Sequence, residues 1–186
     1  MFRTRSLSAA FAAFLSAALL TQASIPPAAA QVAASQNGAV GPSGLPLPRF
    51  VSLKSAKVNS RIGPGSNYPV DWLYLKSGLP MEIIQEFDNW RRVRDADGAE
   101  GWMNQSLLSG KRTAIVAPWQ RGKDATFDLL AEPSREARKV AMVEPGALGV
   151  IRLCNGEWCQ MTFSGHTGWI SQSLVWGAYP GEAIKD

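Results

Sequence analysis

The chain has 186 residues, of which 19 are basic and 15 acidic, with two cysteines and one histidine. Lysine and arginine gather only at Arg91, Arg92 and Arg94, and alternate side chains of a strand face opposite sides, so these three make no continuous patch. So small a net charge without a basic surface argues against nucleic acid as a partner.

The amino terminus has the pattern of a secretory signal peptide. Arg3 and Arg5 precede an apolar run over 7–20, and three alanines at 28–30 form a small-residue cleavage site. We therefore expect a signal peptide over 1–30, whose removal leaves 17 basic and 15 acidic residues. The apolar run is shorter than the roughly 18 residues of a membrane-spanning helix, so we expect no stable membrane insertion after cleavage. An uncleaved anchor is the alternative.

Residues 31–48 carry no charge and consist almost wholly of small and polar residues, proline, valine and leucine. This composition predicts a flexible linker.

One heptapeptide occurs twice beyond the linker, as GWMNQSL at 101–107 and GWISQSL at 168–174, with five of seven positions identical. Trp90 and Trp158 precede the two copies at nearly equal distances, so the similarity extends upstream. We therefore predict two copies of one small module. Their expected bounds are 50–116 and 124–178, joined by 117–123.

The pattern within each module is that of short strands. Runs rich in branched and aromatic residues alternate with turn signals such as GPGSN at 63–67 and DADG at 95–98. We predict an all-β fold in which five or six strands close into a small barrel. The best helical candidate is 133–140, for one or two turns. Asp95 and Asp97 are expected to be turn residues that face water.

The first module resembles the bacterial SH3-like (SH3b) domain nearly end to end. The resemblance lies in VNSRIGPGSNYPV at 58–70, KSG at 76–78, WRRV at 90–93 and GWM at 101–103. The second module keeps the later half of this pattern but has FDLLAEP at 127–133 in place of the earlier signature. The resemblance implies two tandem small SH3-like β-barrels in a secreted or periplasmic protein.

Several residues of these motifs are candidates for ligand contact. Four aromatic residues could form an open groove or simply pack: Tyr68, Trp72, Trp90 and Trp158. For Trp102 and Trp169, which follow Gly101 and Gly168, packing is favoured over ligand contact. Arg61 either holds the loop that follows it or binds a ligand carboxylate.

The two cysteines flank an Asn-Gly turn in CNGEWC at 154–159. Asn-Gly favours a tight hairpin, and cross-strand neighbours lie within disulfide distance. We expect Cys154 and Cys159 to be bonded in an oxidising compartment. A redox pair, or a metal site with His166, is the alternative, although the spacing suits neither.

These observations predict a binding or scaffolding protein of the bacterial envelope without catalytic residues, cofactor or metal. Peptidoglycan or its peptides are the expected partner by family analogy, and an envelope protein is the alternative. An envelope hydrolase is a third hypothesis, because some relatives are joined to cell-wall cysteine peptidases. Such an enzyme needs a thiolate, a histidine base and an orienting residue.

Overall fold

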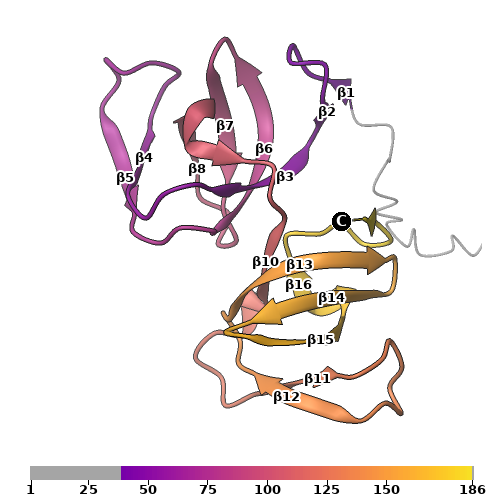
Figure 1. Ribbon diagram of the computed structural model, residues 1–186. Coiled ribbons are helices and arrows are strands. Elements are labelled where there is room, and N and C mark those ends of the chain that lie inside the picture. Colours follow the sequence, from indigo (N-terminus) through magenta and orange to yellow (C-terminus); the bar gives the residue numbers. More distant parts are fainter. Residues whose placement is uncertain (1–38, 186) are drawn as a thin grey trace, which may run out of the picture. The chain divides into compact units, whose positions relative to one another are not determined.

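Two large antiparallel sheets that share one strand order form most of the fold, which is all-β as the sequence predicts (Figure 1). The computed structural model describes residues 39–185, so the predicted signal peptide lies outside the described residues. Within the described part of the chain, no helix is long and apolar enough to span a bilayer.

The first sheet has the strand order β5-β4-β8-β7-β6-β3-β9. Its elements are β3 (Arg49–Leu53), β4 (Val58–Arg61), β5 (Val70–Tyr74), β6 (Pro80–Phe87), β7 (Trp90–Arg94), β8 (Glu100–Asn104), the 3₁₀ turn η1 (Gln105–Leu107) and β9 (Leu108–Ser109).

The second sheet repeats this order as β12-β11-β15-β14-β13-β10-β16, with β17 added on β13. Its elements are β10 (Thr113–Val116), η2 (Pro118–Gln120), β11 (Phe127–Leu130), β12 (Lys139–Val143), β13 (Leu148–Asn155), β14 (Trp158–Phe163), β15 (His166–Ser171), η3 (Gln172–Leu174), β16 (Val175–Trp176) and β17 (Ala183–Ile184). The two sheets are called the first and second barrel below.

The second barrel begins earlier than the sequence suggests. Residues 113–116, expected at the end of the first module, form β10, which pairs with β13 and β16. All four residues are buried, so buried and exposed positions do not alternate along this strand. Such a segment gives no periodic signal that would assign it to either copy.

Two further expectations differ from the structure. Part of the predicted flexible linker, residues 39–48, contains a small hairpin of β1 (Ala39–Val40) and β2 (Pro46–Leu47). The helical candidate at 133–140 is a turn that leads into β12, because Ser134 bonds locally to Glu136 and the segment merely connects two paired strands. Local hydrogen bonds from serine compete with a helix in this way.

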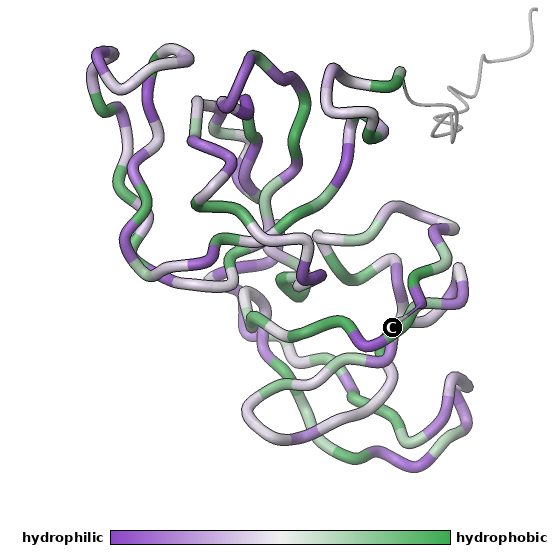
Figure 2. The backbone as a smooth tube through the Cα atoms, turned by 45° about the horizontal axis from the view of Figure 1, so that its top comes forward, coloured by the Kyte–Doolittle hydropathy of each residue, from purple (hydrophilic) through white to green (hydrophobic). Residues whose placement is uncertain are grey.

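Each barrel has its own apolar core, and hydrophobic residues are spread through the strands of both sheets (Figure 2). The first core contains Val51, Leu53, Val58, Tyr74, Met81, Ile83, Val93, Met103 and Leu108. The second contains, among others, Leu129, Ile151, Met161, Phe163 and Ile170 together with both cysteines.

A different cross-strand pair ends the same hairpin in each barrel. In the first barrel Glu86 lies opposite Arg91, and in the second Cys154 lies opposite Cys159. The predicted disulfide is present, with the two Cα atoms 4.1 Å apart. A buried ion pair in one copy therefore stands where the other has a covalent bond.

Glu86 is the most strongly held carboxylate of the first barrel, with a side chain 1% exposed. Its oxygens accept hydrogen bonds from the Ser43 amide at 2.9 Å and hydroxyl at 2.8 Å, and they pair with Arg49 at 2.6 Å and Arg91 at 3.2 Å. Burial alone raises the pKa of Glu86, but the bonds from Ser43 and Arg49 outweigh it and lower the pKa to about 2. The β1–β2 hairpin is thereby attached to the barrel.

The end of β16 and the segment after it contact the first barrel, and both barrels belong to one compact unit of the chain. The Phe50 ring lies 5.0 Å from that of Trp176 and 4.7 Å from that of Tyr179. The Tyr179 hydroxyl donates to Glu82 at 2.9 Å. Burial, and then the charge of Glu82, raise the pKa of Tyr179, so its proton stays in this bond.

The depressed pKa of Glu86 predicts acid sensitivity of the first barrel. Its contribution to the free energy of unfolding is complete above the ordinary value of 4.5 and is lost as pH falls toward 2. Chemical unfolding between about pH 5 and pH 2 should therefore show a loss on the order of 3 kcal/mol from this group, which Glu86→Gln removes from the profile. If exposed Glu144→Gln flattens the profile equally, the assignment is wrong.

The disulfide predicts a local stabilisation of the second barrel. Replacing Cys154 and Cys159 together by alanine should lower the free energy of unfolding by roughly 2 kcal/mol, because the short closed loop restricts the unfolded chain only modestly. Urea unfolding under oxidising conditions measures the change. Equal stability of the two proteins would show that the bond contributes nothing.

Candidate ligand-binding surface

The repeated Gly-Trp motif places a tryptophan on the outer face of each barrel. Gly101 is buried, and a Cβ there would lie 2.0 Å from the Ser60 hydroxyl oxygen. At Gly168 a Cβ would lie 2.7 Å from Leu129 Cγ. Only glycine allows this approach, and strand alternation then directs the half-buried Trp102 and Trp169 outward. Both tryptophans are thus partly packed and partly exposed.

Trp102 lies between two arginines on the first barrel. Trp102 is on β8, and its cross-strand partners are Arg61 on β4 and Arg92 on β7. Trp90 precedes Arg92 by two residues and so faces the same side of β7. We call Arg61, Trp90, Arg92 and Trp102 the Arg-Trp face. It combines two aromatic rings with two cations on a rigid sheet.

Ion pairs hold the arginines of β7 in place. Arg92 lies 2.9 Å from Glu100, and Arg94 lies 2.7 Å from the same carboxylate. The hydrogen bond from Arg94, followed by the charge of Arg92, lowers the pKa of Glu100. Arg91 points inward to Glu86, as alternation predicts, so it contributes nothing to the Arg-Trp face.

Arg61 also organises the loop beyond it. Its Nη1 donates to the Tyr68 carbonyl at 2.6 Å, the loop-holding contact considered from the sequence. The Tyr68 ring lies over Gly63, where a Cβ would come within 2.3 Å of Tyr68 Cδ1. The ring is 41% exposed at the loop surface. The structure thus brings Arg61 and Tyr68 together.

Trp72 lies elsewhere. It is 62% exposed and lines a depression of about 340 Å³ with Tyr74 and Asp95. The Tyr74 hydroxyl donates to Asp95 at 2.8 Å, and burial, then this bond, raises the pKa of Tyr74. Asp97 pairs with Arg121 at 2.8 Å. The two aspartates expected simply to face water are therefore both bonded to side chains.

The second barrel carries the same tryptophans without the arginines. Trp169 has Leu130 and Gln160 as its cross-strand partners, at the positions of Arg61 and Arg92. Trp158 occupies the position of Trp90 and lines a depression of its own. The candidates from the sequence thus fall into three places, and Arg92 is the residue that sequence reasoning missed. Because Arg92 lies two residues after Trp90, the sequence could have placed both on the same side of a strand. The position of Arg92 beside Trp102 follows only from the register of β7 and β8.

The residues considered for redox or metal chemistry show no such arrangement. Cys154 and Cys159 form the disulfide, and no other cysteine exists in the chain. His166 is exposed at the start of β15. Among the described residues, no group of three or more histidine, cysteine, aspartate or glutamate side chains could hold a metal ion.

Comparison with known families gives one match. The model of the bacterial SH3 domain matches residues 54–110 and 123–177. No curated protein matches the chain.

Several solved structures match the chain, with low identities and low TM-scores. They include NlpC2 and NlpC1 from Trichomonas vaginalis, with 14% and 15% identity and TM-scores of 0.31 and 0.30. An NlpC/P60 family protein from Bacillus cereus has 12% identity and a TM-score of 0.30. Each match covers 69% of this chain and 48%, 45% and 56% of the respective structure, so the chain spans about half their length.

The close approach at Gly63 predicts that a single methyl group disturbs the loop. Gly63→Ala should displace the Tyr68 ring and lower the free energy of unfolding by about 1–3 kcal/mol through overpacking. Gly110→Ala is the matched control, since a Cβ there meets nothing within 4 Å. Tyrosine NMR signals and urea unfolding check both effects. An unchanged Tyr68 environment in Gly63→Ala would contradict the packing described.

Proposed function

The chain belongs to the bacterial SH3 domain family, which matches it twice, and from this premise we propose that it is a non-catalytic binding module of the bacterial envelope that engages the cell wall or its peptides. Bacterial SH3 domains commonly bind cell wall. The Arg-Trp face of the first barrel is the observation that carries the proposal.

The chemistry of this face suits a peptide with free carboxylates. Guanidinium groups recognise carboxylates through paired hydrogen bonds, and the indole rings offer flat apolar contact area. Both sets of side chains project from adjacent strands, so little conformational freedom is lost on binding. We propose Arg61, Arg92, Trp90 and Trp102 as the ligand contacts, with Tyr68 at the margin.

The proposed location is the periplasm or the exterior of the cell. The disulfide supports an oxidising compartment, and bacterial SH3 domains are consistent with it. The signal peptide at 1–30 remains part of this proposal. A hydrolase is disfavoured, because the family match identifies only SH3 domains and Cys159 is held in a disulfide.

A docking function toward an envelope protein is the second candidate. Strand β5 is an edge strand of the first sheet, and β5 together with the residue after it carries four exposed apolar residues. They are Val70, Trp72, Leu73 and Leu75. Exposed apolar edges favour association with another protein.

Sedimentation with purified peptidoglycan tests the proposal. The mature chain should move to the pellet, and Arg92→Gln should weaken binding by about fivefold, or ~1 kcal/mol, because it removes one charged contact. Glutamine is the residue that the second barrel has at this position, so the fold accepts it. Trp90→Ala should weaken binding further.

Trp119→Ala is the control, since Trp119 is 54% exposed and lies outside the Arg-Trp face. Wild-type protein that stays in the supernatant would refute wall binding. If Trp72→Ala instead abolishes cross-linking to a protein in periplasmic extract, the docking function is favoured.

A further inference from the structure

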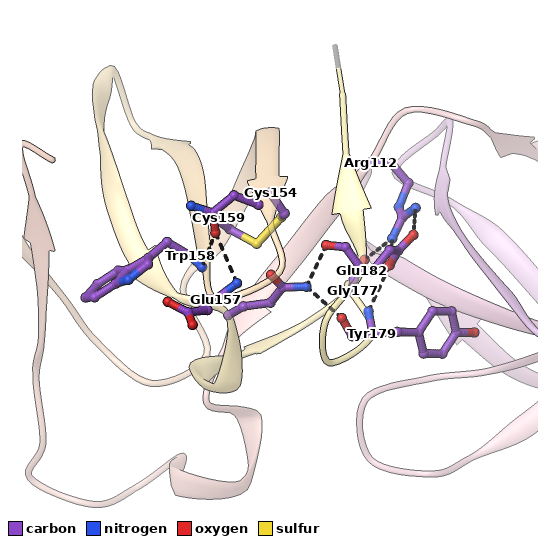
Figure 3. The surroundings of a disulfide bond; sticks show 10 residues. Arg112, Cys154, Glu157, Trp158, Cys159, Gly177, Tyr179 and Glu182 are labelled. Atoms are coloured by element: carbon purple, nitrogen blue, oxygen red, sulfur yellow. Dashed lines mark hydrogen bonds and ion pairs between the residues drawn. A yellow bond between two sulfur atoms is a disulfide. The ribbon is translucent and has the colours of Figure 1, made fainter. Parts of the chain in front are cut away.

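A depression of about 560 Å³ lies beside the disulfide hairpin of the second barrel, a volume in the range of small-molecule sites. Residues that line it include Arg135, Glu157, Trp158, Ser171, Gln172 and Pro180. Figure 3 shows the Trp158 ring extending away from the disulfide, with Glu157 beside it. The depression combines one aromatic face with several polar groups.

The hairpin holds Trp158 in a fixed position. The Asn155 side-chain oxygen accepts hydrogen bonds from the backbone amides of Glu157 at 3.0 Å and Trp158 at 2.8 Å. The next residue, Cys159, is bonded to Cys154 across the strand pair. The segment that carries Trp158 therefore loses little conformational entropy when a ligand contacts the ring.

Gln172 brings an acceptor with no partner. The residue is 4% exposed, and its Nε2 donates to the carbonyls of Tyr179 at 2.6 Å and Glu182 at 2.9 Å. Two carbonyl partners fix which end of the amide is nitrogen. Its Oε1 has no hydrogen-bond partner among the described residues. Buried acceptors are rarely left in this state. The oxygen itself is buried, so a ligand donor reaches it only when the Gln172 side chain shifts toward the depression that it lines.

The first barrel shows why this acceptor is free. Gln105 has the same place in the fold as Gln172. The backbone N–H of each glutamine donates, at 2.8 Å, to the carbonyl of the residue before the hairpin tryptophan, which is Asn89 in the first barrel and Glu157 in the second. The Gln105 Oε1 accepts from the Arg91 guanidinium. Cys159 replaces that arginine in the second barrel, so the donor is gone. Over residues 39–185, the unpaired glutamine oxygen is thus found in the second copy and not in the first.

The remaining polar groups are balanced in charge. Arg135 supplies hydrogen-bond donors and Glu157 acceptors, and both side chains are exposed at the depression. The Ser171 hydroxyl lies 2.9 Å from that of Ser173, so one of the two retains a free donor. A neutral ligand with several hydroxyl groups uses donors and acceptors together. An anionic ligand is repelled by the carboxylate of Glu157, and a cationic ligand is repelled by the guanidinium of Arg135.

We propose that this depression binds a neutral saccharide ring, with Trp158 as the stacking surface and Arg135, Glu157 and Gln172 as hydrogen-bonding groups. The apolar C–H face of a pyranose lies flat on an indole, and its ring hydroxyls project outward toward polar side chains. The inference rests on the proposed wall binding and deepens it: the second barrel takes the glycan strand, whereas the first takes the peptide.

Titration of the mature chain with chitotetraose, followed by the Trp158 indole NMR signal, tests this site. Saturable binding is expected, and Trp158→Ala should weaken it at least about tenfold, as loss of an aromatic anchor does. Arg135→Ala and Glu157→Gln should each weaken it by about threefold to fivefold. Both residues are exposed, so these two variants test the site even if Trp158→Ala unfolds the barrel.

Trp119→Ala is the matched control, because it removes an exposed indole that belongs neither to the depression nor to the Arg-Trp face, and it should leave chitotetraose binding unchanged. No shift of the Trp158 signal with chitotetraose would overturn the inference, as would preferential binding of an acidic tripeptide at the same signal. If chitotetraose does not bind but the protein still sediments with peptidoglycan, only the saccharide site is refuted and the proposed wall binding stands. Saccharide binding without sedimentation would instead overturn the proposed peptide binding by the first barrel.

Discussion

The cross-strand pair that ends the hairpin between β6 and β7, and again between β13 and β14, determines much of what differs between the two barrels. Both positions face inward and are buried, so a charged side chain there must be paired. In the first barrel the occupants are charged, and Glu86 needs Ser43 and Arg49 in addition to Arg91. The ion pair thus attaches the segment before the barrel. A disulfide has no such need.

The replacement of Arg91 by Cys159 also changes the hydrogen bonds of the glutamine that follows the Gly-Trp strand. Gln105 accepts a hydrogen bond from Arg91 through its side-chain oxygen and donates one to Asn89 through its nitrogen, so both ends of its amide are bonded within its own barrel. The Gln172 oxygen accepts no hydrogen bond from a guanidinium among the described residues, and its nitrogen donates to the backbone carbonyls of 179 and 182. The chain after β16 is thereby held against the disulfide hairpin, where it forms one wall of the saccharide depression.

Two copies of one topology therefore present different chemistry from equivalent places. Both use a glycine that admits the neighbouring strand and a tryptophan that alternation turns outward. The first surrounds this ring with arginines, and the second has Leu130 and Gln160 there. A tandem protein of this kind can contact two parts of one polymer, and two weak contacts joined on one chain give a much stronger combined one.

The sequence by itself determined the repeated module, its all-β character and the disulfide, because these depend on local signals: a recurring heptapeptide, turn residues, and two cysteines around Asn-Gly. It also offered the tryptophans and Arg61 as candidates for ligand contact. Only the tertiary structure decided that β10 belongs to the second barrel, that Arg92 flanks Trp102, and that Trp72 lies apart from them. The physical reason is that strand register and pairing are long-range, and a shift by one residue reverses every side chain.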